Sequence, residues 1–175
     1  KKEREQSVRE SATVTQVYYN SGSLQHYKWG NGPKHVLLVH GWEGNAGNFG
    51  GLIPKLVEDG WSVLAFDAPS HGLSAVQPTS MFDFARALYQ LLDEHSVDAI
   101  VAHSFGCVAT IMALLQHTDM HIQRLVMIAS PNRFEDRFRQ IETLFALSPG
   151  VANSLREKIQ AEAGLPIFDF AIADL

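Results

Sequence analysis

Cysteine is the scarcest residue of this chain, which has 175 residues and a single cysteine, Cys107. One cysteine cannot form a disulfide within the chain, so a small disulfide-stapled scaffold is excluded. The first ten residues carry seven charges, where a secretory leader needs an apolar stretch. We therefore expect a cytoplasmic protein.

Positive charge is also in short supply. The chain has 14 Lys and Arg against 19 Asp and Glu, a formal net charge of -5, and its basic residues are scattered after the first few. Nucleic-acid binding needs a basic surface, so we expect no nucleic-acid partner. The long charge-free stretch between Asp98 and Asp119 contains His103, Ser104 and Gln116. These polar residues favour a strand followed by a helix over a membrane span, so we expect no membrane partner.

What is abundant is apolar sequence in short, regular patterns: 46% of the residues are hydrophobic and 19% are charged. Period-2 and continuous apolar runs alternate with helical periodicity, which predicts an α/β fold. The first two runs flank a turn-forming stretch and predict an antiparallel hairpin. Strands are expected at Ala12–Tyr19, Leu24–Trp29, Val36–His40, Ser62–Phe66, Asp98–Ala102 and Leu125–Ala129, and helices at Asn48–Asp59, Met81–Glu94 and Phe105–Gln116.

The last four of these strands have apolar residues at nearly every position, as in HVLLVH, SVLAF, DAIVA and RLVMIA. Parallel strands that are covered by helices on both faces have this composition. The sequence therefore predicts a mostly parallel sheet with an N-terminal antiparallel hairpin and helices on both faces.

The pattern changes after residue 130. Residues 1–130 form the expected sheet core, whereas residues 131–175 hold two helical stretches, Phe134–Leu147 and Val151–Ala163, which resemble a helical cap or insertion. The final segment, residues 165–175, is too apolar for a free tail. We expect it to pack on another surface, and it is a candidate for self-association.

The strongest chemical signal is Ala102-His103-Ser104-Phe105-Gly106, which directly follows one predicted strand and directly precedes a helix. It is G-x-S-x-G with Ala at the first position. A nucleophilic serine on a tight turn needs small residues two before and two after it, because bulkier ones clash with neighbouring backbone. The alternative is an ordinary serine in a turn of small residues.

At this point the chain resembles the α/β-hydrolase family, and a second stretch, His40-Gly41-Trp42, supports the likeness. In that family the His-Gly-x segment shapes an oxyanion hole. The resemblance implies that the backbone N–H groups of Trp42 and Phe105 hold the oxyanion, with Ser104 as nucleophile. Trp42 has a second reading as an aromatic wall of the pocket.

A third stretch, Asp67-Ala68-Pro69-Ser70-His71-Gly72, is similar to the family's D-x-P-G-H-G loop, with Ser70 in place of the usual Gly. The resemblance implies structural roles here. Asp67 is expected to brace the loop and Gly72 to permit its turn. His40 and His71 likewise belong to motifs that support the site.

A general base and its acid are not found where the family places them. The triad runs Ser, then acid, then His along the chain, but only His117 and His121 follow Ser104. The first is expected near the far end of the nucleophile's helix and the second in the loop before the next strand. Glu135 and Asp136 are expected in the first turn of a helix, where acidic residues favour the dipole. We expect an incomplete chain without the base and the acid.

Two other roles are open to the histidines. His71 is a substitute base in one of them. In the other, His40, His71 and His103 hold a metal, but no acidic ligand motif accompanies them and His103 is expected to point away from the serine. The buried thiol of Cys107 is expected to be structural. We expect no metal and no cofactor.

The resulting hypothesis is a serine hydrolase that cleaves a small-molecule carboxylic ester or thioester through an acyl-enzyme on Ser104. One alternative is a catalytically inactive binding or scaffold module with the same sheet. Another is a fragment completed by a second chain.

Overall fold

The computed structural model describes residues 2–20, 22–75, 79–116, 121–164, 166–169 and 171–172. His117 therefore lies outside the described residues. The chain divides into two compact units, Lys1–Ala129 and Ser130–Leu175, which are taken separately below. Within the described ranges, no helix combines the length and apolar character that crossing a bilayer requires.

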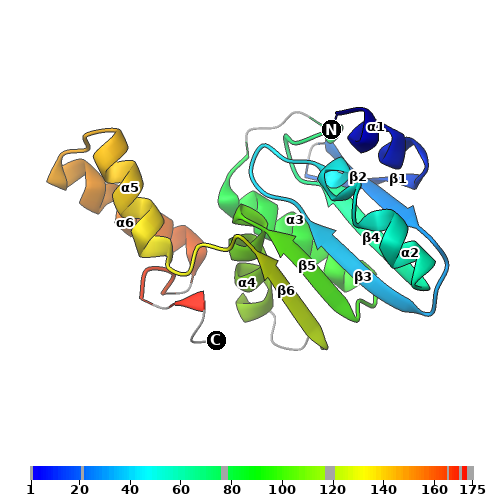
Figure 1. The fold of residues 1–175 in the computed structure, drawn as a ribbon. Helices are drawn as coiled ribbons and strands as arrows, with labels where there is room; N and C mark the ends of the chain where they lie inside the picture. The colour runs from blue at the N-terminus through cyan, green and yellow to red at the C-terminus, as the bar shows by residue number, and fades with distance from the viewer. Residues whose placement is uncertain are drawn as a thin grey trace. The chain divides into compact units, whose positions relative to one another are not determined.

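The first unit is built on a six-stranded sheet with the order β1-β2-β4-β3-β5-β6 (Figure 1). β1 pairs antiparallel with β2, and β2 pairs antiparallel with β4. β4, β3, β5 and β6 are mutually parallel. This confirms the predicted fold class. The strands are β1 (Thr13–Tyr19), β2 (Gly22–Trp29), β3 (Lys34–Val39), β4 (Trp61–Asp67), β5 (Ala99–His103) and β6 (Arg124–Ile128).

Helices cover both faces of this sheet because alternate strand residues point to opposite sides. On one side, Trp29 and Leu38 pack in a core with Val8 of α1 and Ile53 of α2. On the other side, Phe66 of β4 lies edge-on against Phe84 of α3, with ring centroids 5.7 Å apart. The helical elements are α1 (Lys2–Glu10), the 3-10 turn η1 (Ala46–Phe49), α2 (Ile53–Glu58), α3 (Met81–Glu94) and α4 (Phe105–Gln116).

The helix from Met81 to Glu94 has the predicted bounds. Its capping box is present: the Ser80 side chain accepts the N–H of Asp83, and the Asp83 carboxylate accepts the N–H of Ser80. Gly60 follows α2 with φ +81°, the left-handed conformation expected after a helix end.

One helix prediction is wrong, and one helix was not predicted. A continuous helix over Asn48–Asp59 is wrong, because the segment forms η1 and then the short α2. Gly50 and Gly51 separate the two, and Pro54 stands in the first turn of α2, where proline is favoured. α1 was not predicted at all. Val8 is buried within it, and its carbonyl accepts a hydrogen bond from Trp29 Nε1 at 2.8 Å.

The expectation that RLVMIA is buried on both faces is also wrong. β6 is an edge strand, and its residues alternate between exposed and half-buried positions. Val126 is 49% exposed and Ile128 is 44% exposed. A strand at the edge of a sheet has one neighbour, so apolar composition alone does not guarantee burial.

The second unit contains α5 (Phe134–Leu144) and α6 (Pro149–Ala163). The described part of the C-terminal segment packs here: Phe168 lies against the rings of Phe134 and Phe138, 5.2 and 5.3 Å away. The Ile172 N–H also donates to the Asn132 carbonyl. The expected packing of this segment therefore takes place within its own unit.

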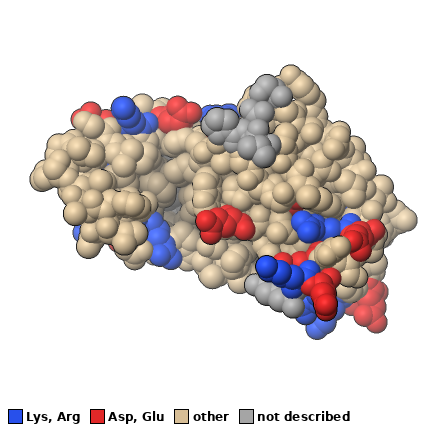
Figure 2. Space-filling model, turned by 90° about the horizontal axis from the view of Figure 1, so that it is seen from above, with Lys and Arg blue, Asp and Glu red and all other residues tan. Residues whose placement is uncertain are grey.

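Charged side chains of both signs are interspersed on the face shown in Figure 2. Red and blue side chains lie close together in groups, and tan surface separates one group from the next. This arrangement accords with the low net charge of -5. The absence of a nucleic-acid partner stays a prediction.

Candidate active site

Ser104 lies on a strained turn between β5, which ends at His103, and α4, which begins at Phe105. Its φ is +52°, in the left-handed region that side chains with a Cβ rarely adopt. The Ser104 N–H donates to the Ile128 carbonyl of β6 at 2.8 Å. Strain of this kind persists only where the surroundings hold it, and it is typical of functional sites.

Close backbone approaches explain the small residues around the serine. A Cβ on Gly106 would lie 2.4 Å from the His40 carbonyl oxygen, so only glycine fits between α4 and the end of β3. A Cβ on Gly41 would lie 3.2 Å from both the His103 carbonyl oxygen and the Ser104 Cβ. Ala102 is fully buried in the middle of the sheet. The two motifs therefore pack directly against each other.

A cavity of about 450 Å³ opens beside this turn. It lies where the carboxyl ends of β3 and β5 meet, which is the usual place for a ligand in an open α/β sheet. Gly41 and His103, which adjoin Ser104, both line it. The other lining residues are His40, Trp42, Glu43, Gly44, Asn48, Phe49 and Ile128.

Two backbone N–H groups flank the serine. Trp42 follows the end of β3, and Phe105 is the first residue of α4, whose N-terminal N–H groups have no partner within the helix. In the ranges that the structure describes, neither N–H donates a hydrogen bond. The Trp42 ring is 47% exposed and lies edge-on to Phe105 at 5.3 Å. Trp42 can therefore provide both an aromatic wall of the cavity, through its ring, and a hydrogen-bond donor, through its backbone N–H.

His40 is a structural brace. Its ring is 1% exposed; Nδ1 donates to the Gly41 carbonyl at 2.7 Å, and Nε2 accepts the Ala68 N–H at 3.1 Å. Burial lowers the pKa of His40 to about 4. Both ring nitrogens are engaged and the imidazole is neutral at pH 7, so His40 ties the end of β3 to the loop after β4.

Asp67 is the anchor of that loop. It is fully buried, and its carboxylate accepts hydrogen bonds from the Ala46 N–H, the Leu73 N–H and the Tyr27 hydroxyl, all within 2.9 Å. Burial and this neighbouring carboxylate raise the pKa of Tyr27. Gly72 has φ +54°, and a Cβ there would lie 2.1 Å from an Asp67 carboxylate oxygen. The Asp67 carboxylate therefore fixes the conformation of the loop through these hydrogen bonds.

The same loop contains Ser70 and His71. Ser70 has φ +61°, the left-handed conformation that a glycine would adopt without a steric penalty. His71 is 8% exposed, and its Nδ1 donates to the Pro69 carbonyl at 2.8 Å. Its ring lies edge-on to Trp42 at 5.0 Å and to Phe84 of α3 at 5.7 Å.

Phe84 was not anticipated as part of this region. Its ring contacts Phe66, His40, His71 and Phe105 at centroid distances of 5.1 to 5.7 Å. In the sequence it is one more apolar residue of an amphipathic helix, so nothing in its spacing separates it from ordinary core residues. Its ring helps to hold His40, His71 and Phe105 in place.

His121 and Ser104 lie at opposite ends of β6, and Glu135 and Asp136 belong to α5 of the second unit. His121 precedes β6, whereas Ser104 bonds to the last residue of that strand. Five strand residues at about 3.3 Å each separate those two ends of the sheet. In the second unit, Glu135 pairs with Arg139 at 2.6 Å and with Arg156. The hydrogen bond from Arg156 holds the pKa of Glu135 below its usual range.

Comparisons with known proteins identify relatives of this arrangement. A family model described as "alpha/beta hydrolase fold" matches residues 34–174. A "Serine hydrolase-like protein" of Danio rerio is 34% identical over 110 residues, covering 57% of this chain and 32% of that protein.

Two solved structures share the fold. The "Thioesterase Domain From Curacin Biosynthetic Pathway" superposes with a TM-score of 0.64 and 20% identity, covering 75% of this chain and 52% of that one. The epoxide hydrolase VrEH1 from Vigna radiata superposes with a TM-score of 0.65 and 19% identity, covering 78% and 45%. The chain thus spans about a third of the length of the zebrafish relative and about half of each solved structure.

Proposed function

The chain belongs to the α/β-hydrolase family, and from that premise we propose that it is the nucleophile-bearing part of a serine hydrolase that cleaves carboxylic esters or thioesters. Ser104 is the nucleophile in this proposal, and the backbone N–H groups of Trp42 and Phe105 form the oxyanion hole. The general-base histidine and the acid are not among the 175 residues.

The observation that carries the proposal is the conformation of Ser104. A non-glycine residue at φ +52°, between a buried strand and the N-terminus of a helix, projects its side chain from a sharp turn. A glycine would adopt the same φ without the steric cost that the serine side chain brings. The N–H groups of Trp42 and Phe105 donate no hydrogen bond among the described residues and are available for an oxyanion. The cavity beside the turn offers space for a substrate.

The reaction would proceed in two steps. Ser104 Oγ attacks the carbonyl carbon, the base removes the hydroxyl proton, and the carbonyl oxygen becomes an oxyanion held by the two N–H groups. The alcohol or thiol leaves with that proton, which forms an acyl ester on Ser104. Water then attacks the acyl ester by the same route and releases the carboxylic acid. Each oxyanion-hole donor contributes roughly 100- to 1,000-fold to such a rate.

A fluorophosphonate probe tests the nucleophile directly. Because the base is absent from these residues, we expect slow covalent labelling of Ser104, located by mass spectrometry of the digested protein, and only the residual turnover of p-nitrophenyl acetate that the oxyanion hole supports. Both signals are expected to be lost in Ser104→Ala, because the attacking oxygen is removed. Ser154→Ala removes an exposed hydroxyl of α6 in the second unit and serves as the matched control.

The result also separates the alternatives. Labelling and turnover at Ser104 would exclude the inactive scaffold. Folded protein without labelling, verified by circular dichroism, would contradict a competent nucleophile in this chain. Labelling that appears only when a second chain is added would favour a site completed by that chain.

A further inference from the structure

One histidine of the sheet has no hydrogen-bond partner among the residues that the structure describes. His26 lies in β2 and is 7% exposed. Neither Nδ1 nor Nε2 has a partner within the part of the chain that the structure describes. Its ring lies edge-on to Phe66, 6.3 Å away. Buried polar atoms in proteins are almost always paired, so an imidazole left without partners indicates a ligand that the protein atoms do not supply.

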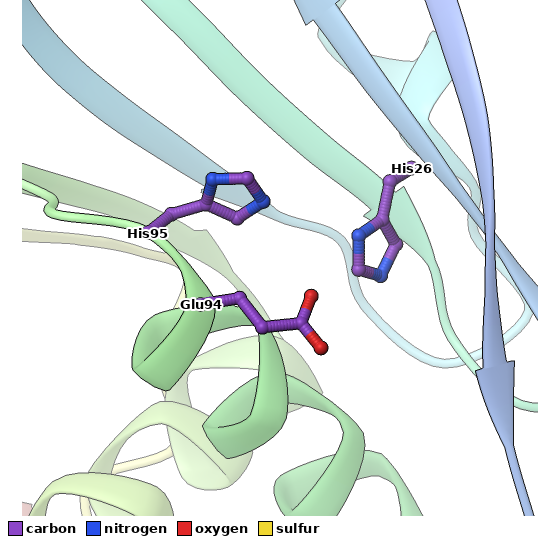
Figure 3. Close-up of side chains that lie close together, drawn as sticks. All are labelled: His26, Glu94 and His95. Atoms are coloured by element: carbon purple, nitrogen blue, oxygen red, sulfur yellow. The ribbon is translucent and has the colours of Figure 1, made fainter.

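Two further metal-ligating side chains face this histidine. Glu94 is the last residue of α3 and His95 is its C-cap. One ligand atom from each, together with one from His26, lie within 4.8 Å of one another. Figure 3 shows the Glu94 carboxylate and the His95 ring turned toward the His26 imidazole from the end of the helix. Among the described residues no other group of His, Cys and carboxylate side chains meets this spacing.

We propose that His26, Glu94 and His95 bind a zinc ion through two imidazole nitrogens and one carboxylate oxygen. Three protein ligands of these types, with a fourth position for water, are an established coordination pattern of zinc. Tetrahedral coordination at usual zinc distances places ligand atoms about 3.3 Å apart. Glu94 and His95 are exposed, so rotation of their side chains can close the remaining separation without moving the sheet.

The chemistry of the three ligands favours zinc over calcium or magnesium. Hard cations prefer shells built of oxygen, whereas two imidazoles suit zinc and its first-row neighbours. An imidazole with the ordinary pKa of about 6.5 is mostly neutral at pH 7, so a nitrogen lone pair is available for a metal. Gln90 Nε2 donates to Glu94 Oε1 at 2.9 Å, which orients the carboxylate.

This assignment departs from the expectation that the chain binds no metal. That expectation concerned His40, His71 and His103, which stand in the motif loops. The ion would instead join β2 to the end of α3, so its first effect would be on stability. The adjacent pair Glu94-His95 is visible in the sequence, but nothing in its spacing indicates that His26 is its neighbour.

Titration of the chelator-stripped 175-residue protein with Zn²⁺ in a calorimeter tests the proposal. We expect one ion per chain, and a loss of affinity of more than about 100-fold in Glu94→Gln and in His95→Ala, because loss of a group that only orients a ligand already costs about 10- to 100-fold. Both positions are exposed, so the variants are expected to fold. Asp93→Asn removes the neighbouring exposed carboxylate, and His121→Ala removes an exposed imidazole of the loop before β6. These two matched controls are expected to bind as the wild type does.

A second readout does not depend on the heat of binding. Zn²⁺ is expected to raise the urea midpoint of the wild type but not that of the double variant Glu94→Gln/His95→Ala, because only the native state presents the three ligands together. The proposal is overturned if the wild type binds no zinc at about 100 µM. It is equally overturned if the double variant binds as tightly as the wild type, since the ion would then occupy other histidines.

Discussion

At the scale of single residues, the site is held in place by backbone conformations that ordinary side chains avoid. Ser104 and Ser70 both adopt positive φ, at +52° and +61°. The first carries the proposed chemistry, and its strain has a functional reading. The second stands in a loop where the related motif has glycine, so its strain has no such reading.

Replacement of Ser70 tests whether the left-handed conformation of its loop is strained. Ser70→Gly and Ser70→Ala both remove the hydroxyl, but only glycine adopts φ +61° without a steric cost. We expect the glycine variant to be the more stable of the two by about 1 kcal/mol in urea unfolding. Equal stability of the two variants would show that the loop relaxes out of the left-handed conformation.

The buried imidazole of His40 predicts sensitivity to acid. Its pKa is about 4 in the folded chain, against about 6.5 in an unfolded one. Between these values the unfolded chain binds more protons, so stability is complete above pH 6.5 and decreases as the pH falls toward 4. The difference amounts to about 3 kcal/mol at most. We expect His40→Gln to show a shallower loss of unfolding free energy over that range, whatever its stability at pH 7.

At the scale of secondary-structure elements, glycines decide how closely the helices approach the sheet. Gly106 of α4 faces the His40 carbonyl, where a Cβ would lie 2.4 Å from oxygen. Gly150 of α6 has nothing within 4 Å of the same position. The first glycine is therefore tightly packed against backbone, whereas the second borders open space.

Alanine at these two positions is therefore expected to have opposite effects. Gly106→Ala forces α4 away from β3 and should lower the unfolding free energy by about 3 kcal/mol. Gly150→Ala adds a better helix former in open space and should raise it by up to about 1 kcal/mol. Chemical denaturation measures both. A Gly106→Ala variant as stable as the wild type would contradict the close packing of the two motifs.

The elements could largely be predicted from the sequence, for reasons that individual residues make clear. Ser80 and Asp83 mark the start of α3, and apolar periodicity carries it to Glu94. α1 was missed because charged residues dominate it and only Val8 is buried. The break between η1 and α2 was missed because the spacing of the apolar residues alone does not indicate that Gly50 and Gly51 interrupt the helix. The nucleophile turn was predictable because strand, small residues and helix are consecutive, whereas the cluster of His26 and Glu94 depends on long-range pairing.

At the scale of the whole molecule, one edge of the sheet exposes apolar side chains. Val126 and Ile128 of β6 are both more than two-fifths exposed. Exposed apolar edge strands favour pairing with another chain. The self-association expected of residues 165–175 stays a prediction, and β6 adds a second surface at which the chain can associate.

Sedimentation at increasing protein concentration measures this tendency. We expect the 175-residue wild type to associate, and Val126→Lys to remain monomeric at concentrations about tenfold higher, because an edge lysine must be desolvated on pairing. Val151→Lys changes an equally exposed valine on α6, which offers no strand edge, and is expected to associate like the wild type. Association unchanged by Val126→Lys would locate the contact elsewhere.

The hydrogen bond from the Ser104 N–H to the Ile128 carbonyl gives this edge a second significance. The amide of the proposed nucleophile is protected from solvent by a strand that has only one neighbour in the sheet. Fraying of β6 would therefore free that amide before the interior of the sheet opens. The exchange rate of a single backbone proton, at Ser104, thus reports how often the sheet edge detaches and how long the serine keeps its backbone conformation.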